Sequence, residues 1–157
     1  MRVAILTLSD TRGVGSDESG RVVRALIEGV PGAEVVETAI LPDEQAAIAA
    51  ALVRLADEVG CGLVLTTGGT VVAPRDVTPE ATLAVCDRLV PGLAEVMRAV
   101  SLTKTPMAMI SRAVAGLRGR TLIVNLPGSP KGARECLEAI LPALPHAVEL
   151  AGGGKPH

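Results

Sequence analysis

The chain has 157 residues, 48% of them hydrophobic, which suits one domain with a single substantial core. Its 15 Lys and Arg residues against 17 Asp and Glu residues give a formal net charge of -2, so the positive field that non-specific nucleic-acid binding requires is missing. The chain contains no Phe, Tyr or Trp, which excludes sites built on aromatic stacking or aromatic cages.

Apolar runs of strand length alternate with segments of helical periodicity in the first half of the chain. Residues 3–8 are apolar at nearly every position, as expected for a strand covered on both faces. A helix is predicted over 18–28, a second strand over 35–41, a helix over 43–59 and a third strand over 62–66. This alternation is typical of βα units around a mostly parallel sheet.

The second half carries the same pattern with shorter elements. Thr78 followed by Pro79 predicts the start of a helix with Thr78 as its N-cap. The other predicted elements are a helix over 92–101, a short strand over 107–110, a strand over 121–126 and a helix from Lys131 that Pro142 and Pro145 interrupt. We therefore predict a single α/β domain over residues 1–157, a three-layer sandwich whose mostly parallel sheet is covered by helices on both faces, with a flexible tail over 151–157.

Three further features of the sequence exclude a membrane span and make disulfide, zinc and histidine chemistry unexpected. No window of about 18 residues is free of charges and of Gly or Pro breaks, so no membrane-spanning helix is expected. Cys61, Cys86 and Cys136 form no C-x-x-C pair, which favours core thiols of a cytoplasmic protein over a disulfide framework or a zinc site. His146 and His157 lie near the C-terminus, so catalysis without histidine is expected.

Polar and glycine-rich loops follow the predicted strands, where a doubly wound sheet binds its ligands. These loops contain Ser9-Asp10-Thr11, Pro42-Asp43-Glu44, the stretch 68–76, Ser111-Arg112 and Pro127-Gly128-Ser129. Each loop alone is also compatible with an ordinary turn or a helix cap. Glycine turns that feed helix starts are suited to phosphate, although the P-loop and G-x-G-x-x-G motifs are absent.

Several motifs in order carry a family resemblance. In the first half they are Leu8-Ser9-Asp10-Thr11-Arg12, Asp17-Glu18-Ser19-Gly20, Leu41-Pro42-Asp43-Glu44, Leu65-Thr66-Thr67-Gly68-Gly69-Thr70 and Arg75-Asp76-Val77-Thr78-Pro79-Glu80-Ala81-Thr82. In the second half they are Pro91-Gly92-Leu93, Ser111-Arg112-Ala113, Gly116-Leu117-Arg118-Gly119 and Asn125-Leu126-Pro127-Gly128-Ser129-Pro130-Lys131. From residue 3 to residue 148 the chain resembles the molybdopterin adenylyltransferases of the MogA/MoaB type, which include the gephyrin G domain.

The resemblance implies an enzyme that transfers AMP from Mg-ATP to the terminal phosphate of molybdopterin and releases pyrophosphate. It assigns Asp43 and Asp76 as catalytic residues and Mg²⁺ ligands. It assigns as substrate-binding residues Ser9, Asp10, Gly68, Gly69, Thr70, Ser111, Arg112, Asn125, Pro127, Gly128 and Ser129. Cations in or near these loops that would balance phosphate charge are Arg12, Arg75, Lys104, Arg112 and Lys131.

The chemistry of this reaction fits a chain without a histidine base. A phosphate monoester is already mostly ionised at neutral pH, so it attacks without a general base. Mg²⁺ usually takes one or two protein carboxylates together with substrate phosphates and water. The structural alternative for Asp43 and Asp76 is that they are helix caps or solvated loop acids.

The family loop commonly reads Gly-Gly-Thr-Gly, whereas this chain has Val71 at the fourth position, which would be strained if that position needed positive φ. Val71 therefore favours an alternative interpretation, in which the chain is a MoaB-like homologue that binds pterin or nucleotide with little or no turnover. A purely structural oligomer is a further alternative. The resemblance also implies molybdopterin and ATP as partners, a homotrimer or a hexamer of two trimers, and handover to a molybdate-inserting enzyme, with no nucleic acid and no membrane.

Overall fold

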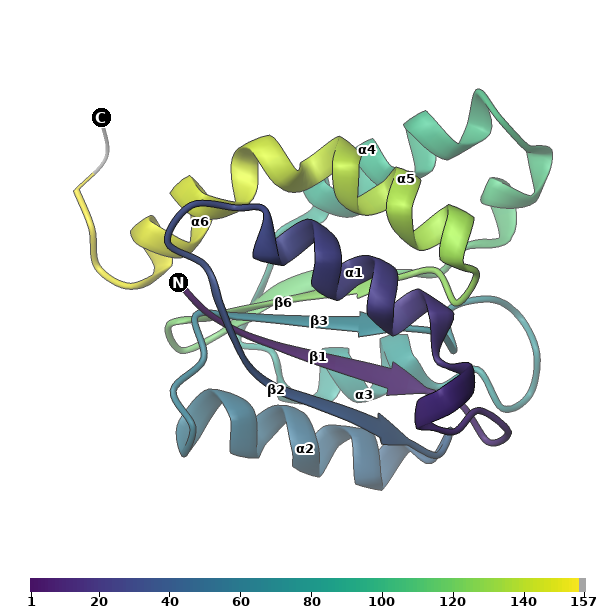
Figure 1. The fold of residues 1–157 in the computed structure, drawn as a ribbon, viewed down its shortest axis with the longest axis horizontal. Coiled ribbons are helices and arrows are strands. Elements are labelled where there is room, and N and C mark those ends of the chain that lie inside the picture. Colours follow the sequence, from purple (N-terminus) through teal and green to yellow (C-terminus); the bar gives the residue numbers. More distant parts are fainter. Residues whose placement is uncertain (156–157) are drawn as a thin grey trace.

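The computed structural model describes residues 1–155 and contains one six-stranded sheet (Figure 1). In spatial order its strands are β2 (Glu34–Leu41), β1 (Arg2–Leu8), β3 (Leu63–Thr67), β6 (Thr121–Leu126), β5 (Ala115–Arg118) and β4 (Arg88–Leu89). The first four strands run parallel, and β5 and β4 are antiparallel to their neighbours. The order reverses between β1 and β3, since the chain leaves β1 for one edge and returns on the other side of it.

The carboxyl ends of three central strands lie level. Thr7 of β1 pairs with Thr67 of β3, and Thr67 pairs with Leu126 of β6. Leu8 pairs with Leu41 at the end of β2. The loops that follow these strands therefore leave the sheet at one edge, which is why motifs far apart in the sequence come together there.

Helices cover both faces of the sheet (Figure 1). One face carries α1 (Glu18–Glu28), α4 (Pro91–Leu102), α5 (Pro130–Ile140) and α6 (Leu144–Ala151), and the other carries α2 (Gln45–Asp57) and α3 (Thr78–Val85). Short 3-10 turns are η1 (Val14–Ser16), η2 (Pro106–Ile110) and η3 (Leu141–Ala143). The predicted three-layer α/β sandwich is confirmed.

The strand β1 shows why apolar residues fill its positions without alternation. Val3 and Ile5 pack in the core beneath α1 and α5, whereas Ala4, Leu6 and Leu8 pack in the second core beneath α2. All five side chains are at most 3% exposed. Because successive side chains of a strand point to opposite faces, a central strand needs apolar residues at both parities.

The predicted strand over 107–110 is wrong. This segment is the 3-10 turn η2, which begins with Pro106 and is capped by Thr105, whose hydroxyl accepts a hydrogen bond from the Met107 N–H at 3.2 Å. Met107 and Met109 are 63% and 72% exposed, so they do not take the buried positions of a core strand. Four residues are too few for their periodicity to separate a strand from a turn, and Pro106 fixes a φ that starts the helical turn.

One other local expectation, the cap of α3, needs correction. Thr78 is the first residue of α3, and Val77 takes the N-cap position that we predicted for Thr78. The Thr78 hydroxyl instead donates to the carbonyl oxygen of Gly68 at 2.9 Å. Pro79 lies in the first turn, as predicted.

Both ends of the described chain lie at the amino ends of the strands, opposite the loops of interest (Figure 1). The Met1 ammonium donates to the Gly32 carbonyl, and Arg120, in the turn before β6, donates to the Gly152 carbonyl. The helix break expected at Pro142 and Pro145 is confirmed by η3 and the start of α6. The flexibility expected over 151–157 stays a prediction, because α6 ends at Ala151 and residues 156–157 lie outside those described.

The cysteines and the helices agree with the sequence analysis. Cys61 and Cys136 are buried, Cys86 is half-buried, and all three are free thiols. Burial raises the pKa of Cys86 to about 11, helped by the nearby Asp87, so this thiol stays protonated at neutral pH. Within residues 1–155 no helix combines the length and the apolar character needed to cross a membrane.

Candidate active site

Glycines bring three strand-end loops into direct contact. Gly68, directly after β3, has φ of +100°, and a Cβ placed on it would lie 2.5 Å from the Leu8 carbonyl oxygen at the end of β1. A Cβ on Gly128, after β6, would lie 3.2 Å from the Gly68 Cα. Only residues without side chains allow this approach, so the two glycines fix where the loops after β1, β3 and β6 meet.

Gly69, the residue after Gly68, contacts the loop that follows β2. Its φ is +68°, and a Cβ there would lie 2.4 Å from Thr78 Oγ1 and 3.1 Å from Asp43 Oδ1. The Asp43 carboxylate therefore lies against the Gly69 backbone. The two glycines predicted from the sequence thus join the acidic loop to the loop after β3.

Asp10 and Asp43 lie together at this edge of the sheet, and Asp76 is near enough for its charge to act on Asp43; these three residues are called the acidic cluster below. Asp43 donates its backbone N–H to Asp10 Oδ1 at 3.0 Å, and Arg75 binds both Asp10 oxygens at 2.9 Å. Asp43 Oδ1 is buried and has no hydrogen-bond partner in the described part of the chain. The structure therefore brings the two predicted catalytic acids into one cluster and leaves one buried carboxylate oxygen available to a ligand.

The electrostatics of the cluster are asymmetric. Desolvation, followed by the negative charges of Asp10 and Asp76, raises the pKa of Asp43. The hydrogen bond from Arg75 lowers the pKa of Asp10, with the Asp43 backbone N–H as the second cause. Asp43 is thus a carboxylate that repulsion and burial destabilise, and a bound cation would relieve both.

Asp76 organises its own loop. Its Oδ2 accepts hydrogen bonds from the backbone N–H groups of Val71 and Ala73, each at 3.2 Å. Among the described residues only glycines have positive φ, so Val71 is not strained in the position where the family commonly has glycine. The loop accommodates this β-branched residue.

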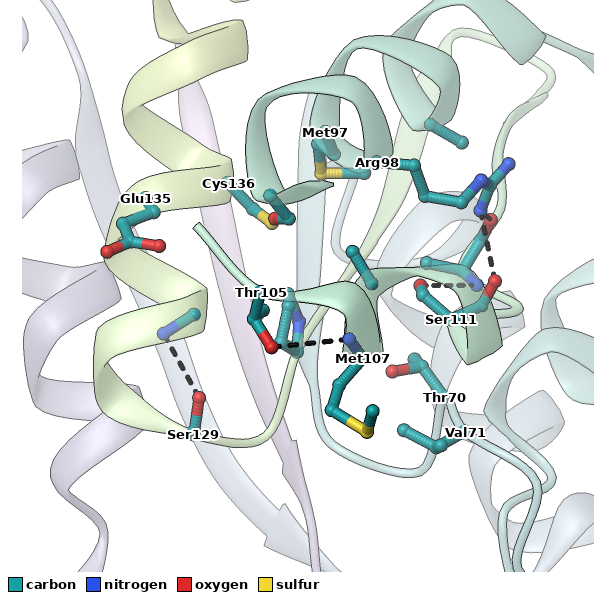
Figure 2. Close-up of a pocket in the computed structure, with 16 residues that line it drawn as sticks. Thr70, Val71, Met97, Arg98, Thr105, Met107, Ser111, Ser129, Glu135 and Cys136 are labelled. Atoms are coloured by element: carbon teal, nitrogen blue, oxygen red, sulfur yellow. Dashed lines mark hydrogen bonds between the residues drawn. The ribbon is translucent and has the colours of Figure 1, made fainter. Parts of the chain in front are cut away.

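A cavity of about 190 Å³ opens beside the loop, between α4, η2 and the start of α5 (Figure 2). Of the predicted site residues, it is lined by Thr70, Ser111, Pro127 and Ser129. Ser129 caps α5, accepting the Gly132 N–H at 3.0 Å, so its hydroxyl hydrogen remains free to donate. Four predicted residues therefore line this cavity, whereas Asp10, Asp43 and Asp76 belong to the acidic cluster.

Most of the cavity wall was not predicted from the sequence. Besides Val71, which the sequence had already singled out, the wall contains Ala94, Met97, Arg98, Ser101, Thr105, Met107, Ala108, Ala113, Gly132, Glu135 and Cys136. On α4, Ala94, Met97, Arg98 and Ser101 recur at helical spacing, and this spacing is the signal that would have found that wall. Arg98 also holds the wall, because it donates to the Ala113 carbonyl at 2.8 Å.

Three predicted ligand residues are engaged by the protein itself. Asn125 is fully buried, donates to Thr66 and Thr82 Oγ1 at 3.1 and 3.0 Å, and accepts the Val114 N–H. Ser9 accepts the N–H groups of residues 11 and 12 and so closes its own turn. The guanidinium of Arg112 binds carbonyl groups of the neighbouring loop and the Glu80 carboxylate of α3. Of the three, Asn125 lies deepest, and it is not one of the residues that line the cavity.

The predicted phosphate-balancing cations have different environments. Arg12 donates to Ser19 Oγ at 3.2 Å and to the Gly128 carbonyl at 2.9 Å, which ties the loop after β1 to the loop after β6. Arg75 is paired with Asp10. Lys104 and Lys131 are exposed, and each is close in sequence to a cavity residue, Thr105 and Ser129 respectively. Of the predicted cations, only these two lysines have side chains that make no hydrogen bond or ion pair with the described residues.

The cluster suits a cation that brings most of its own ligands. Within residues 1–155 no group of three or more His, Cys, Asp or Glu side chains forms a complete metal site. Asp43 and Asp76 supply carboxylate oxygens, the hard ligands that Mg²⁺ prefers, and the buried free oxygen of Asp43 fits a metal ligand. Two carboxylates with substrate phosphates and water are a usual Mg²⁺ environment.

The chain is similar to known proteins over nearly its whole length. Residues 4–146 match the family model described as a probable molybdopterin binding domain. The molybdopterin adenylyltransferase of Helicobacter pylori strain J99 is 44% identical over 156 residues, which cover 98% of this chain and 89% of that protein. The enzyme of the same name from Escherichia coli K12 is 47% identical over 146 residues, covering 89% and 73%.

A solved structure of a related protein has the same fold. The crystal structure of the molybdopterin biosynthesis enzyme MoaB from Thermus thermophilus superimposes with a TM-score of 0.89 at 56% sequence identity. The match covers 99% of this chain and 98% of that one. The similarity therefore includes every strand-end loop that forms the acidic cluster and the cavity.

Proposed function

Because this chain belongs to the family of molybdopterin adenylyltransferases of the MogA/MoaB type, we propose that it adenylylates molybdopterin with Mg-ATP during molybdenum cofactor biosynthesis. The observation that carries the proposal is the acidic cluster beside Gly69, in which Asp43 keeps a buried carboxylate oxygen without a partner among the described residues, near a largely apolar cavity that Thr70, Ser111 and Ser129 also line. A nucleotide and a second phosphorylated substrate require two such neighbouring regions. The homologues with little turnover and the structural oligomer have no comparable support, because Val71 is unstrained and the curated relatives are named as transferases.

The reaction needs placement and charge neutralisation more than proton transfer. An oxygen of the terminal phosphate of molybdopterin attacks the α-phosphorus of ATP, the new P–O bond forms, and the bond to the β-phosphate breaks to release pyrophosphate. The attacking phosphate is mostly ionised at neutral pH, so no residue has to remove a proton. The absence of histidine from the site is consistent with this chemistry.

In this proposal each region has a defined task. Asp43 and Asp76 hold Mg²⁺, which would offset the phosphate charge that accumulates during transfer. Gly68, Gly69 and Gly128 let backbone groups approach the phosphates closely. Thr70, Ser111 and Ser129 offer hydroxyl groups toward the cavity, where they would position a polar substrate.

The proposal is tested by pyrophosphate release from Mg-ATP by the purified protein. We expect release only when molybdopterin, generated in the same tube, is present, and we expect a chelator to stop it. Matched reactions with GTP and CTP test the adenine preference, which rests on the family alone. If molybdopterin binds but no pyrophosphate is released, the protein is a molybdopterin-binding protein and not an enzyme of this reaction.

Val71 is the residue with which to test whether the loop sequence limits activity. Val71→Gly removes no strain, because Val71 has negative φ, and it gives the loop more conformational freedom, at a cost of roughly 0.5–1 kcal/mol. We therefore expect the affinity for Mg-ATP to fall by about two- to fivefold, measured by calorimetry. A rise in affinity would mean that the valine side chain obstructs the nucleotide.

We also propose that the protein works in the cytoplasm as a homotrimer or as a hexamer of two trimers, and passes adenylylated molybdopterin to a molybdate-inserting enzyme. Exposed apolar side chains, including Val72, Leu89 and Met109, support self-association. Light scattering of the purified protein with and without ATP tests the assembly. A monomer at micromolar concentration would refute it.

A further inference from the structure

Arg112 binds three groups that all belong to one segment of the chain. Its Nε donates to the Val71 carbonyl at 2.5 Å, Nη2 donates to the Asp76 carbonyl at 2.6 Å, and Nη1 donates to Glu80 Oε1 at 2.5 Å. Its backbone N–H also donates to the Thr70 carbonyl at 2.7 Å. Val71 and Asp76 are the two ends of the loop 71–76, so one planar group closes that loop.

Glu80 provides a fixed point for this guanidinium. It is the third residue of α3, in the first helical turn, where the helix N-terminus favours a carboxylate. Its Oε1 accepts from Arg112, and its Oε2 is buried without a hydrogen-bond partner among the described residues. Because α3 packs in the core through Ala81, Thr82 and Val85, it cannot shift easily, and Arg112 is anchored to it.

The loop closed by Arg112 carries Asp76 and borders the cavity. Asp76 Oδ2 holds the Val71 and Ala73 N–H groups, so the orientation of this carboxylate depends on the shape of the loop. Ser111, directly before Arg112, lines the cavity together with Val71. Arg112 thus connects the wall of the cavity to the loop that bears one of the two acids.

We propose that Arg112 and Glu80 are a positioning pair that holds loop 71–76 so that the Asp76 carboxylate stays beside Asp43. This inference rests on the proposed function, in which Asp76 binds the metal. It gives Arg112 a role different from direct phosphate binding, because three of the five guanidinium N–H groups already bind the protein. Arginine is needed because a lysine ammonium cannot span these partners from one planar fork.

The test compares Arg112→Lys and Glu80→Gln with a matched pair of controls. Arg118 also makes a three-contact fork, to both Asp57 oxygens and to the Val85 carbonyl, away from the site. Arg118→Lys and Asp57→Asn therefore impose the same chemical change elsewhere. Glu80→Gln retains an acceptor oxygen and the side-chain shape, so it is the milder variant if Arg112→Lys folds poorly.

The first measurement is amide hydrogen exchange at Val71 and Ala73 in the protein without substrates. We expect about tenfold faster exchange in Arg112→Lys, a smaller increase in Glu80→Gln, and no change in the controls. The second is the Mg²⁺ concentration that gives half-maximal pyrophosphate release, which we expect to rise about tenfold in Arg112→Lys. The KM for molybdopterin should stay within about twofold of the wild-type value.

Three results would overturn the positioning pair. They are unchanged exchange at both amides, a higher KM for ATP or molybdopterin with unchanged exchange, and lower turnover with an unchanged Mg²⁺ requirement. The second would make Arg112 a substrate ligand, and the third would mean that only the folded fraction falls. If the wild-type protein releases no pyrophosphate, the proposed function fails, and the exchange data still decide whether the pair holds the loop.

Discussion

Asp76→Asn is expected to lower molybdopterin-dependent pyrophosphate release by about 10²-fold or more. The side-chain oxygen of asparagine can still accept the Val71 and Ala73 N–H groups that Asp76 Oδ2 accepts, so the loop keeps its shape. What changes is the other position, where an N–H₂ donor replaces an oxygen that could bind a cation. The variant therefore separates the metal role of Asp76 from its structural role.

The measurement compares turnover and molybdopterin binding in the same preparation. Binding should stay within about twofold of the wild-type value, because in the proposed function the Asp76 carboxylate would bind the metal and not the pterin. Asp57→Asn, on the far side of the sheet from the cavity, is the control and should leave both unchanged. Full turnover in Asp76→Asn would remove this residue from the catalytic assignment.

Asp43→Asn is expected to abolish turnover to a similar degree while making the protein more stable. The wild-type carboxylate is desolvated, lies near the negative charges of Asp10 and Asp76, and has a buried oxygen without a partner among the described residues. Removing the charge relieves the desolvation and the repulsion; because solvent screens this partly exposed group, we expect a gain of at most about 1 kcal/mol and a Tm up to about 3 °C higher at pH 7. Such opposite effects on activity and stability are typical of residues kept for function.

The pH dependence of this gain follows from the direction of the shift. The pKa of Asp43 is raised in the folded state above its ordinary value of 3.8, so the cost of its charge is fully present above the raised pKa. As the pH falls through that pKa the wild-type carboxyl becomes protonated in the folded state, and below 3.8 it is protonated in both states. The difference in Tm between the two proteins should therefore vanish at low pH.

Thermal unfolding at pH 7 and at acidic pH, followed by circular dichroism, measures this difference. Glu44→Gln is the control, because Glu44 is exposed, neighbours Asp43 and makes no cap hydrogen bond with its side chain. It should have the wild-type Tm at each pH. An Asp43→Asn protein less stable than wild type at pH 7 would show that the carboxylate makes a net favourable interaction.

The long elements were predictable because their patterns are physically forced. A central strand such as β1 must be apolar on both faces, and helices such as α1 and α5 must present one apolar face to the sheet. The short strands β4 and β5 were missed, because Arg88 and Leu89 are exposed and β5 contains Gly116, so neither has a strand pattern. The strand predicted over 107–110 was wrong for the opposite reason, because these residues are apolar like a core strand but form an exposed turn.

The candidate site was predictable in its loops and less so in its contacts. The edge of the sheet where Asp43, Gly69 and Asp76 meet follows from the parallel strand order, which aligns their carboxyl ends. The partners of Arg112 did not follow, because a positive charge in a ligand loop is equally compatible with phosphate or with carbonyl groups. In the sequence, Glu80 follows the Thr78-Pro79 helix start, and only the three-dimensional arrangement pairs it with Arg112.

The placement of the chain ends has a practical consequence for work with this protein. The Met1 ammonium and the turn after α6 both lie at the amino ends of the strands, so the edge with the acidic cluster faces the other way (Figure 1). A tether at the C-terminal end would attach the molecule to a sensor surface with its substrate entrance turned toward the solution. Binding kinetics for molybdopterin and nucleotide should then be measurable on an oriented layer, without the steric block that random lysine coupling at Lys104 or Lys131 would cause.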